Sequence, residues 1–309
     1  MVICSGCEKE KEVKNDGPFP ELQTFQVDNI TGNSFTISGQ VVNDNGLPIL
    51  EKGFIWSKLG LIDRQFHEGH VIITESSDIF TSSITGLLPS TQYIACSFAT
   101  NINGTAYGNI EDFYTTDRIW SEKGSFTDSR DGQEYEWVKI GNQIWMAENL
   151  RYMPFVCDSF STGIWVYGKY SADLDTARNE VNYQTFGCLY DYATASTISP
   201  DGWHLPSSSE WQVLINFLGG EDNAGSLLKS SDPQFWIYQG SVDATGFKAL
   251  PGGAHMSGFR YIGDRSFFWN STEYNESHAE AYYLSNSTGR LSRTIQYKYY
   301  GLSVRCLKD

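Results

Sequence analysis

The sequence contains no long apolar run, few basic residues and none of the short motifs of common catalytic sites. No segment approaches the roughly 20 apolar residues that a membrane-spanning helix needs. Only 22 lysines and arginines stand against 37 acidic residues, which gives a formal charge of −15. Because such a chain repels phosphate backbones, we expect no nucleic-acid partner. Gly-x-Ser-x-Gly, phosphate-binding glycine loops and His-Glu-x-x-His are missing, so the sequence predicts no cofactor and no catalytic residue.

Cysteine and histidine are also scarce, with six and five residues. Apart from Cys4 and Cys7, four cysteines remain, and their spacing matches no zinc pattern. Cys96 lies in an apolar strand-like run and is expected to be a buried filler. A Cys157–Cys188 bridge is compatible with an exported protein, but the pairing among these two and Cys306 stays open.

The histidines do not form a predicted metal site. His67 and His70 lie in a loop without a helical pattern, and His204 is expected to pack in the core with its ring nitrogens bonded to backbone. The lectin-type calcium signature Glu-Pro-Asn is missing, and Trp269-Asn270-Ser271 lacks the second acid of Trp-Asn-Asp. We therefore predict no metal.

A length of 309 residues suggests about two domains. Residues 1–17 resemble an N-terminus with a polar tether, and 18–117 show short strands between turns, such as the alternating run 34–41. The Gly-Leu-x-Pro-x-Thr-x-Tyr element resembles the corner of fibronectin type III domains, where Leu87 would enter the core and Tyr93 would fix the last hairpin. We predict a fibronectin/Ig-like β-sandwich that acts as a spacer.

Residues 118–309 open with an alternating strand over 132–140, a Gly141-Asn142 turn and a second strand over 143–146. Only two segments are predicted to be helical, 189–197 and 207–218, the second with a Ser207–Glu210 capping box. The remainder is predicted to form short aromatic strands at 247–250, 259–262, 267–272, 281–284 and 302–306.

Three blocks in this second half occur in a fixed order: 141–151, 202–211 and 301–306, with further blocks at 246–253 and 268–274. Together they resemble the Fibrobacter succinogenes major paralogous domain of Bacteroidetes-type surface proteins. The resemblance implies a C-type-lectin-like fold. The predicted fold class is therefore mostly β, with an α+β head: a fibronectin/Ig-like sandwich over 18–117, then a lectin-like domain over 118–309.

The first residues resemble the end of a bacterial lipoprotein signal, because small residues precede Cys7 and a charged run follows it. Cys4 stands where this signal normally has Leu, and no basic or apolar stretch precedes it. The resemblance predicts lipid attachment at Cys7, membrane contact only through that lipid, and location at the outer membrane or cell surface.

A tyrosine-rich C-terminal stretch is the predicted ligand face, since tyrosine gives contact area at low entropic cost and Ser and Asn adapt their hydrogen bonds. The candidates are Tyr274, Asn275, His278, Tyr282, Tyr283, Asn286, Arg290, Arg293, Tyr297 and Tyr299.

The sequence therefore favours a non-catalytic surface lipoprotein that binds a protein or glycan in adhesion or recognition. Two alternatives remain. One is an enzyme, either formylglycine-generating-like, although Cys306 lacks the second nearby cysteine of that family, or active on polysaccharide. The other is a structural subunit of a surface fibre.

Overall fold

The computed structural model describes residues 17–58, 67–158, 161–170, 172–237 and 240–309. The chain divides into two compact units; the first ends at Tyr114 and the second contains Thr115–Asp309. In the described residues no helix is long and apolar enough to cross a membrane. The lipid-attachment prediction at Cys7 lies outside the described residues.

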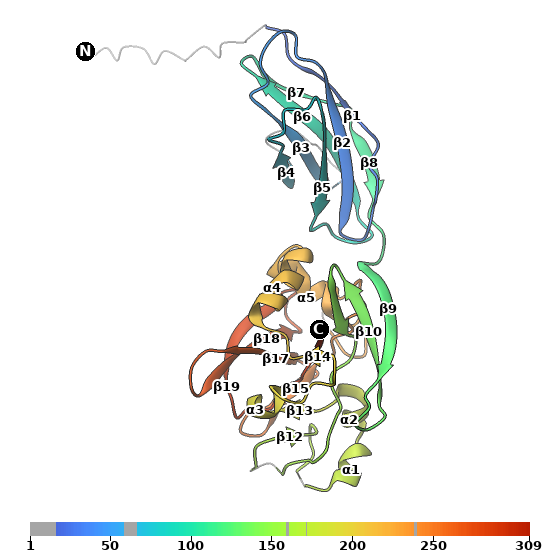
Figure 1. The fold of residues 1–309 in the computed structure, drawn as a ribbon. Coiled ribbons are helices and arrows are strands. Elements are labelled where there is room, and N and C mark those ends of the chain that lie inside the picture. Colours follow the sequence, from blue (N-terminus) through green and yellow to red (C-terminus); the bar gives the residue numbers. More distant parts are fainter. Residues whose placement is uncertain (1–16, 59–66, 159–160, 171, 238–239) are drawn as a thin grey trace, which may run out of the picture. The chain divides into compact units, whose positions relative to one another are not determined.

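The first unit is a sandwich of two antiparallel sheets (Figure 1). One sheet has the order β1-β2-β5 and the other β4-β3-β6-β7, with β8 also paired to β6. The strands are β1 Glu21–Thr24, β2 Ser34–Asn43, β3 Glu51–Lys58, β4 Gly69–Ile72, β5 Ile79–Thr85, β6 Gln92–Asn101, β7 Gly104–Tyr107 and β8 Glu111–Tyr114.

Alternation along β2 places its apolar side chains between the sheets, as the sequence pattern predicts. Phe54 of β3 and Phe80 of β5 meet there with ring centroids 4.9 Å apart. Leu87 and Tyr93 of the predicted corner are both buried, and so is Cys96. The predictions of a β-sandwich and of a buried filler at Cys96 are therefore confirmed.

The second unit contains two five-stranded sheets and one strand pair. The first sheet has the order β14-β20-β11-β10-β9, the second β16-β15-β17-β18-β19, and β12 pairs with β13. The strands are β9 Trp120–Thr127, β10 Glu134–Ile140, β11 Gln143–Met146, β12 Ile164–Trp165, β13 Leu189–Tyr190, β14 Trp203–His204, β15 Gly252–His255, β16 Phe259–Ile262, β17 Arg265–Glu273, β18 His278–Ser285, β19 Ser292–Tyr297 and β20 Leu307–Lys308.

The predicted strand positions are mostly right, with two exceptions. The hairpin β10–β11 forms at the predicted turn, with Ile140 opposite Gln143. The predicted strands at 247–250 and 302–306 were wrong, because both segments make only isolated bridges and the last strand begins at Leu307.

The described residues of the second unit contain five helices rather than the two predicted. They are α1 Leu174–Arg178, α2 Val181–Phe186, α3 Tyr192–Ala195, α4 Ser208–Phe217 and α5 Glu221–Leu228. The capping box of α4 is present. α1, α2 and α5 were missed because they are short, and α5 follows directly on the Gly219-Gly220 pair that was taken as a stop.

The sequence blocks 141–151, 202–211 and 301–306 meet inside this unit. The Met146 N–H donates to the Cys306 carbonyl at 3.0 Å, and the Leu150 N–H to the Val304 carbonyl at 2.9 Å. Below them the rings of Trp145 and Trp211 lie 4.7 Å apart in the apolar core. Segments from three of these blocks therefore meet in the interior of the second unit.

Candidate functional site

Four aromatic side chains form a continuous row at the end of the β18–β19 hairpin; we call them the aromatic ridge: His278, Tyr297, Tyr299 and Tyr300. His278 and Tyr297 are cross-strand partners with ring centroids 4.2 Å apart. Tyr297 and Tyr299 stack at 5.2 Å, and Tyr299 meets Tyr300 at 5.0 Å. Tyr297 is 41% and Tyr299 51% exposed. The ridge therefore presents aromatic surface to solvent from a fixed backbone.

Two other predicted face residues, Tyr274 and Asn275, border the ridge, and Arg293 lies four residues from Tyr297 on the same strand. Tyr274 is exposed, and its N–H donates to the His278 carbonyl at 3.1 Å. The Asn275 Oδ1 accepts the His278 N–H at 2.9 Å and so shapes the turn. Arg293 is exposed on β19 and pairs with Glu280 at 3.2 Å. That these residues form a ligand face stays a prediction.

Tyr282 was wrongly assigned to the face, because it is 1% exposed. Its ring packs 5.1 Å from Trp211, and its hydroxyl lies 3.4 Å from the Ser208 hydroxyl. Strand alternation is the reason: Tyr282 and Tyr283 point to opposite sides of β18. Tyr283 is half-buried and stacks on Phe267 at 5.7 Å.

Asn286 and Arg290 serve local structure. The Asn286 side chain accepts the Ile237 N–H at 2.9 Å and donates to the Gly263 carbonyl. The Arg290 guanidinium pairs with Glu221 and with Asp222 at the start of α5. Of the ten predicted residues, the ridge contains His278, Tyr297 and Tyr299, and Tyr274 and Asn275 lie at its border.

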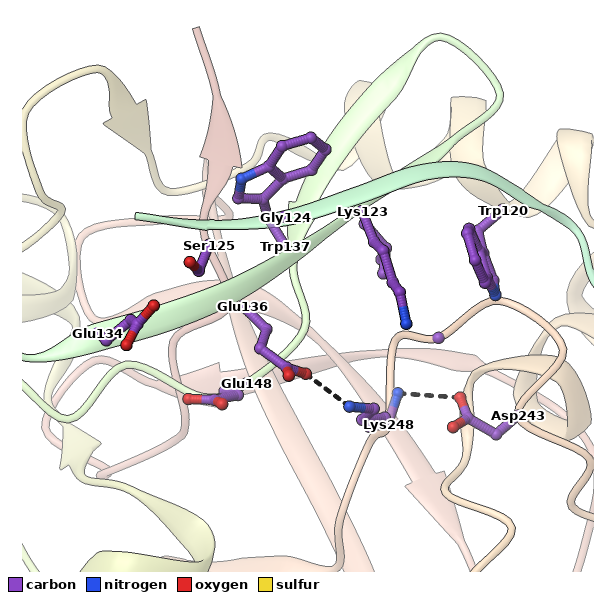
Figure 2. Close-up of a pocket in the computed structure, with 12 residues that line it drawn as sticks. Trp120, Lys123, Gly124, Ser125, Glu134, Glu136, Trp137, Glu148, Asp243 and Lys248 are labelled. Atoms are coloured by element: carbon purple, nitrogen blue, oxygen red, sulfur yellow. Dashed lines mark hydrogen bonds and ion pairs between the residues drawn. The ribbon is translucent and has the colours of Figure 1, made fainter. Parts of the chain in front are cut away.

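A pocket of about 670 Å³, the larger pocket, opens beside β9 and β10 (Figure 2). Glu136 and Lys248 point toward each other across it and pair at 2.6 Å. Trp120 lies at one end, while the indole of Trp137 packs over Gly124. Its remaining charges come from Lys123, Glu134, Glu148 and Asp243, so carboxylates predominate.

Asp243 is the most perturbed carboxylate of the larger pocket. Burial raises its pKa to about 6, although the Lys248 N–H donates to its Oδ1 at 3.1 Å. Its positive φ of 44° belongs to the tight turn before Gly246. At neutral pH this turn therefore holds a poorly hydrated negative charge.

A second cavity of about 290 Å³, the smaller pocket, shares Glu148 and Lys248 with the larger one. Arg305 lines it from the interior, and Phe186 and Phe235 from the side. The Arg305 guanidinium donates to Asn149 Oδ1 at 2.8 Å and to the Met146 carbonyl at 3.3 Å. The two cavities therefore adjoin each other at Glu148 and Lys248.

Sequence reasoning missed both pockets. Glu134 and Glu136 are exposed on β10, and an alternating strand with polar residues on its solvent side gives no sign of a site. The partner of Glu136 is 112 residues away in sequence. Only the tertiary fold brings them together, so no local spacing could have identified the site.

The histidine predictions need one correction. His204 is not in the core with backbone partners; its Nδ1 lies 2.6 Å from Asp309 and its Nε2 3.0 Å from Glu210. Partial burial opposes its protonation, but these carboxylates outweigh that effect and raise its pKa. His67 and His70 contact each other at 3.2 Å. Across the described residues no group of three or more His, Cys, Asp or Glu could hold a metal ion.

The cysteines Cys96, Cys157, Cys188 and Cys306 are buried free thiols. Burial raises the pKa of Cys306 to about 12, and its Sγ lies 3.5 Å from the Ser199 hydroxyl. The Cys157 thiol donates to the Thr162 carbonyl at 3.2 Å. The open question of their pairing is answered for this structure: none is bridged.

Several solved structures resemble part of the chain. The sixth fibronectin type III domain of human fibronectin type III domain containing protein 3 is 17% identical, with 32% of this chain and 89% of that one covered and a TM-score of 0.27. The sensor domain of the anti-sigma factor RsgI4 from Pseudobacteroides cellulosolvens is 16% identical, with 31% and 94% covered and a TM-score of 0.24. No curated protein matches the chain.

The second half carries the family assignment. The model of the Fibrobacter succinogenes major domain matches residues 138–308, which is more than half of the sequence. The matched range contains the aromatic ridge and all residues that line the smaller pocket, whereas seven of the twelve residues that line the larger pocket precede it. The chain belongs to the Fibrobacter succinogenes major domain family.

Proposed function

We propose that this protein is an exported surface lipoprotein whose domain 118–309, with a C-type-lectin-like fold, binds a glycan or protein without catalysis. The fibronectin type III-like domain 18–117 acts as a spacer. The main observation that supports this proposal is the aromatic ridge. It offers stacked rings with two well-exposed tyrosines, and the polar side chain of Asn275 lies at its border.

The ridge has the properties of a recognition surface. Tyrosine and arginine are enriched at binding hot spots, and a tyrosine side chain loses little entropy on binding because it has two torsions. His278 and the tyrosines hold one another in place, so the rings need little rearrangement to meet a ligand. Such a preorganised surface suits adhesion or recognition.

The cysteine-based enzyme alternative finds less support. A nucleophilic cysteine needs an exposed thiolate of low pKa. Cys306 is fully buried, its pKa is raised, and the nearest charged side chains do not offset its burial. A reactive centre built on Cys306 would therefore require part of the core to open.

The test is a binding screen of the full chain against glycan arrays and surface proteins, followed by the double variant Tyr297→Ala/Tyr299→Ala. Two lost hot-spot rings should weaken binding at least about tenfold, since each such truncation commonly costs more than 1 kcal/mol. The melting temperature should stay nearly unchanged, because both rings are exposed.

Tyr170→Ala is the matched control, because Tyr170 is an exposed tyrosine of the same domain away from the ridge. Unchanged affinity of the double variant for every ligand found would refute the ridge as the binding face. Tyr282→Ala is unsuitable, since its ring belongs to the core and its loss would destabilise the fold.

A further inference from the structure

Arg305 is a buried cation without a carboxylate in contact. It is 1% exposed and lies between the rings of Phe247 and Phe268, 4.3 and 5.6 Å from their centroids. Its hydrogen-bond acceptors are Asn149 Oδ1 and the carbonyls of Met146 and Phe247, and all of these are neutral. A charge buried among neutral partners is costly unless something compensates it.

One of the five guanidinium N–H groups also lacks an acceptor among the described residues. Nε donates once, Nη1 twice and Nη2 once, which accounts for four donors. The smaller pocket is lined by this same side chain. An acceptor placed in the pocket would therefore meet a cation with an unused donor, whose nearest carboxylates, Glu148 and Asp243, act on it without a hydrogen bond.

The walls of the smaller pocket add to this preference. Arg151 and Lys248 lie at its sides, while Glu148, its single acidic residue, pairs with Arg151 at 2.9 Å. The lining of the smaller pocket therefore contains three cationic side chains and one carboxylate. Phe186 and Phe235 give an apolar wall, with ring centroids 6.0 Å apart. Apolar walls with a few convergent polar groups are typical of small-molecule sites.

The larger pocket continues the site with different chemistry. The two cavities share Glu148 and Lys248 and measure about 290 and 670 Å³. The carboxylates and the indole of Trp120 in the larger one suit a neutral, hydroxyl-rich group, since carboxylates accept hydrogen bonds from hydroxyls. An acidic polypeptide would be repelled there, whereas sugar units would not.

We propose that the smaller pocket binds the carboxylate of an acidic sugar against Arg305 and Lys248, while neutral units of the same glycan occupy the larger pocket. This site is separate from the aromatic ridge and does not depend on it. Phe186 and Phe235 would contact the sugar ring that carries the carboxylate. The head would then distinguish uronic-acid-containing glycans from neutral ones.

The experiment uses the full chain and an oligosaccharide that carries one terminal galacturonic acid on neutral galactose units, with its methyl ester as the neutral counterpart. Titration calorimetry should show binding of the acid and an affinity at least about tenfold lower for the ester, since charge-assisted hydrogen bonds are the strong ones. The substitution Lys248→Gln should lower the affinity for the acidic oligosaccharide by about the same factor. Lys139→Gln is the matched control, because Lys139 is also paired with a glutamate, Glu122 at 2.6 Å, but lines neither pocket.

Nuclear magnetic resonance of the native chain gives a readout that does not depend on any variant folding. The Arg305 guanidinium resonance should shift with the acid and not with the ester. Tyr297→Ala/Tyr299→Ala should leave this binding intact, which separates the site from the ridge. Equal affinity for acid and ester, no binding of either at millimolar concentration, or binding only of a peptide with a free C-terminal carboxylate would each overturn the proposal.

Discussion

At the scale of single residues, two buried cations hold the second unit together through carbonyl groups. The Lys229 ammonium donates to the carbonyls of Ser285 and Thr288, each at 2.6 Å, and lies 4.8 Å from the Trp236 ring. Burial lowers its pKa to about 8. Arg305 acts similarly on the Met146 and Phe247 carbonyls. These side chains tie the loop residues Thr288 and Phe247 to the ends of β18 and β11.

Asp243 makes stability depend on pH in a direction unusual for a carboxylate. Its pKa is near 3.8 when hydrated and about 6 in the folded chain, so the folded state binds a proton that the unfolded state releases. Stability from this group is full below pH 4 and falls as pH rises to 6.

Asp243→Asn should therefore raise the free energy of unfolding above pH 6 by on the order of 1 kcal/mol and give no gain below pH 4. Asparagine keeps the acceptor for the Lys248 N–H and tolerates the positive φ of this turn. Urea unfolding at pH 3.5 and 7.5 measures the effect, with the exposed Asp201→Asn as control. An equal gain at both pH values would contradict the explanation.

At the scale of elements, α4 is the helix that local signals specify best. The Ser207 hydroxyl accepts the Glu210 N–H at 3.3 Å, and the Glu210 carboxylate accepts the Ser207 N–H at 2.7 Å. The N-terminal capping box and the apolar face formed by Trp211, Leu214 and Ile215 could both be predicted from the sequence.

Ser207→Ala should lower the free energy of unfolding of the second unit by about 1 kcal/mol, because it removes one side of the capping box. Gln212→Ala on the exposed face of α4 is the control and should change stability by less than about 0.5 kcal/mol. Urea denaturation followed by tryptophan fluorescence reports both. No loss in Ser207→Ala would mean that packing alone holds the first turn.

α1, α2 and α5 show why other helices escaped prediction. α1 and α2 have five and six residues, too few for a stable isolated helix. α5 is longer but contains Gly225, where a Cβ would come within 2.4 Å of the Gly289 carbonyl oxygen. Close packing against that loop, rather than helix propensity, selects glycine there and the helix around it.

At the scale of the whole molecule, the predicted lipid attachment at Cys7 would decide where the ridge and the pockets act. If Cys7 carries a lipid, expression in a bacterium that processes lipoproteins should place the protein in the membrane fraction. Cys7→Ser should release it and abolish incorporation of a labelled fatty acid, because the thiol is the attachment point. Cys4→Ser is the matched control, and labelling that survives Cys7→Ser would disprove attachment there.

Sequence patterns alone determined the β-rich class, the sandwich, the β10–β11 hairpin, α4 and the family. Each follows from period-two alternation, turn residues, a capping box or ordered motifs, all of which are local. They also identified the tyrosine-rich stretch, but not which rings face water: Tyr282 and Tyr283 are neighbours, and sheet packing alone buries the first. The pockets depend entirely on tertiary structure, since Glu136 meets Lys248 and Asn149 meets Arg305 across more than one hundred residues. Such contacts depend on how sheets and loops pack, and no local spacing encodes them.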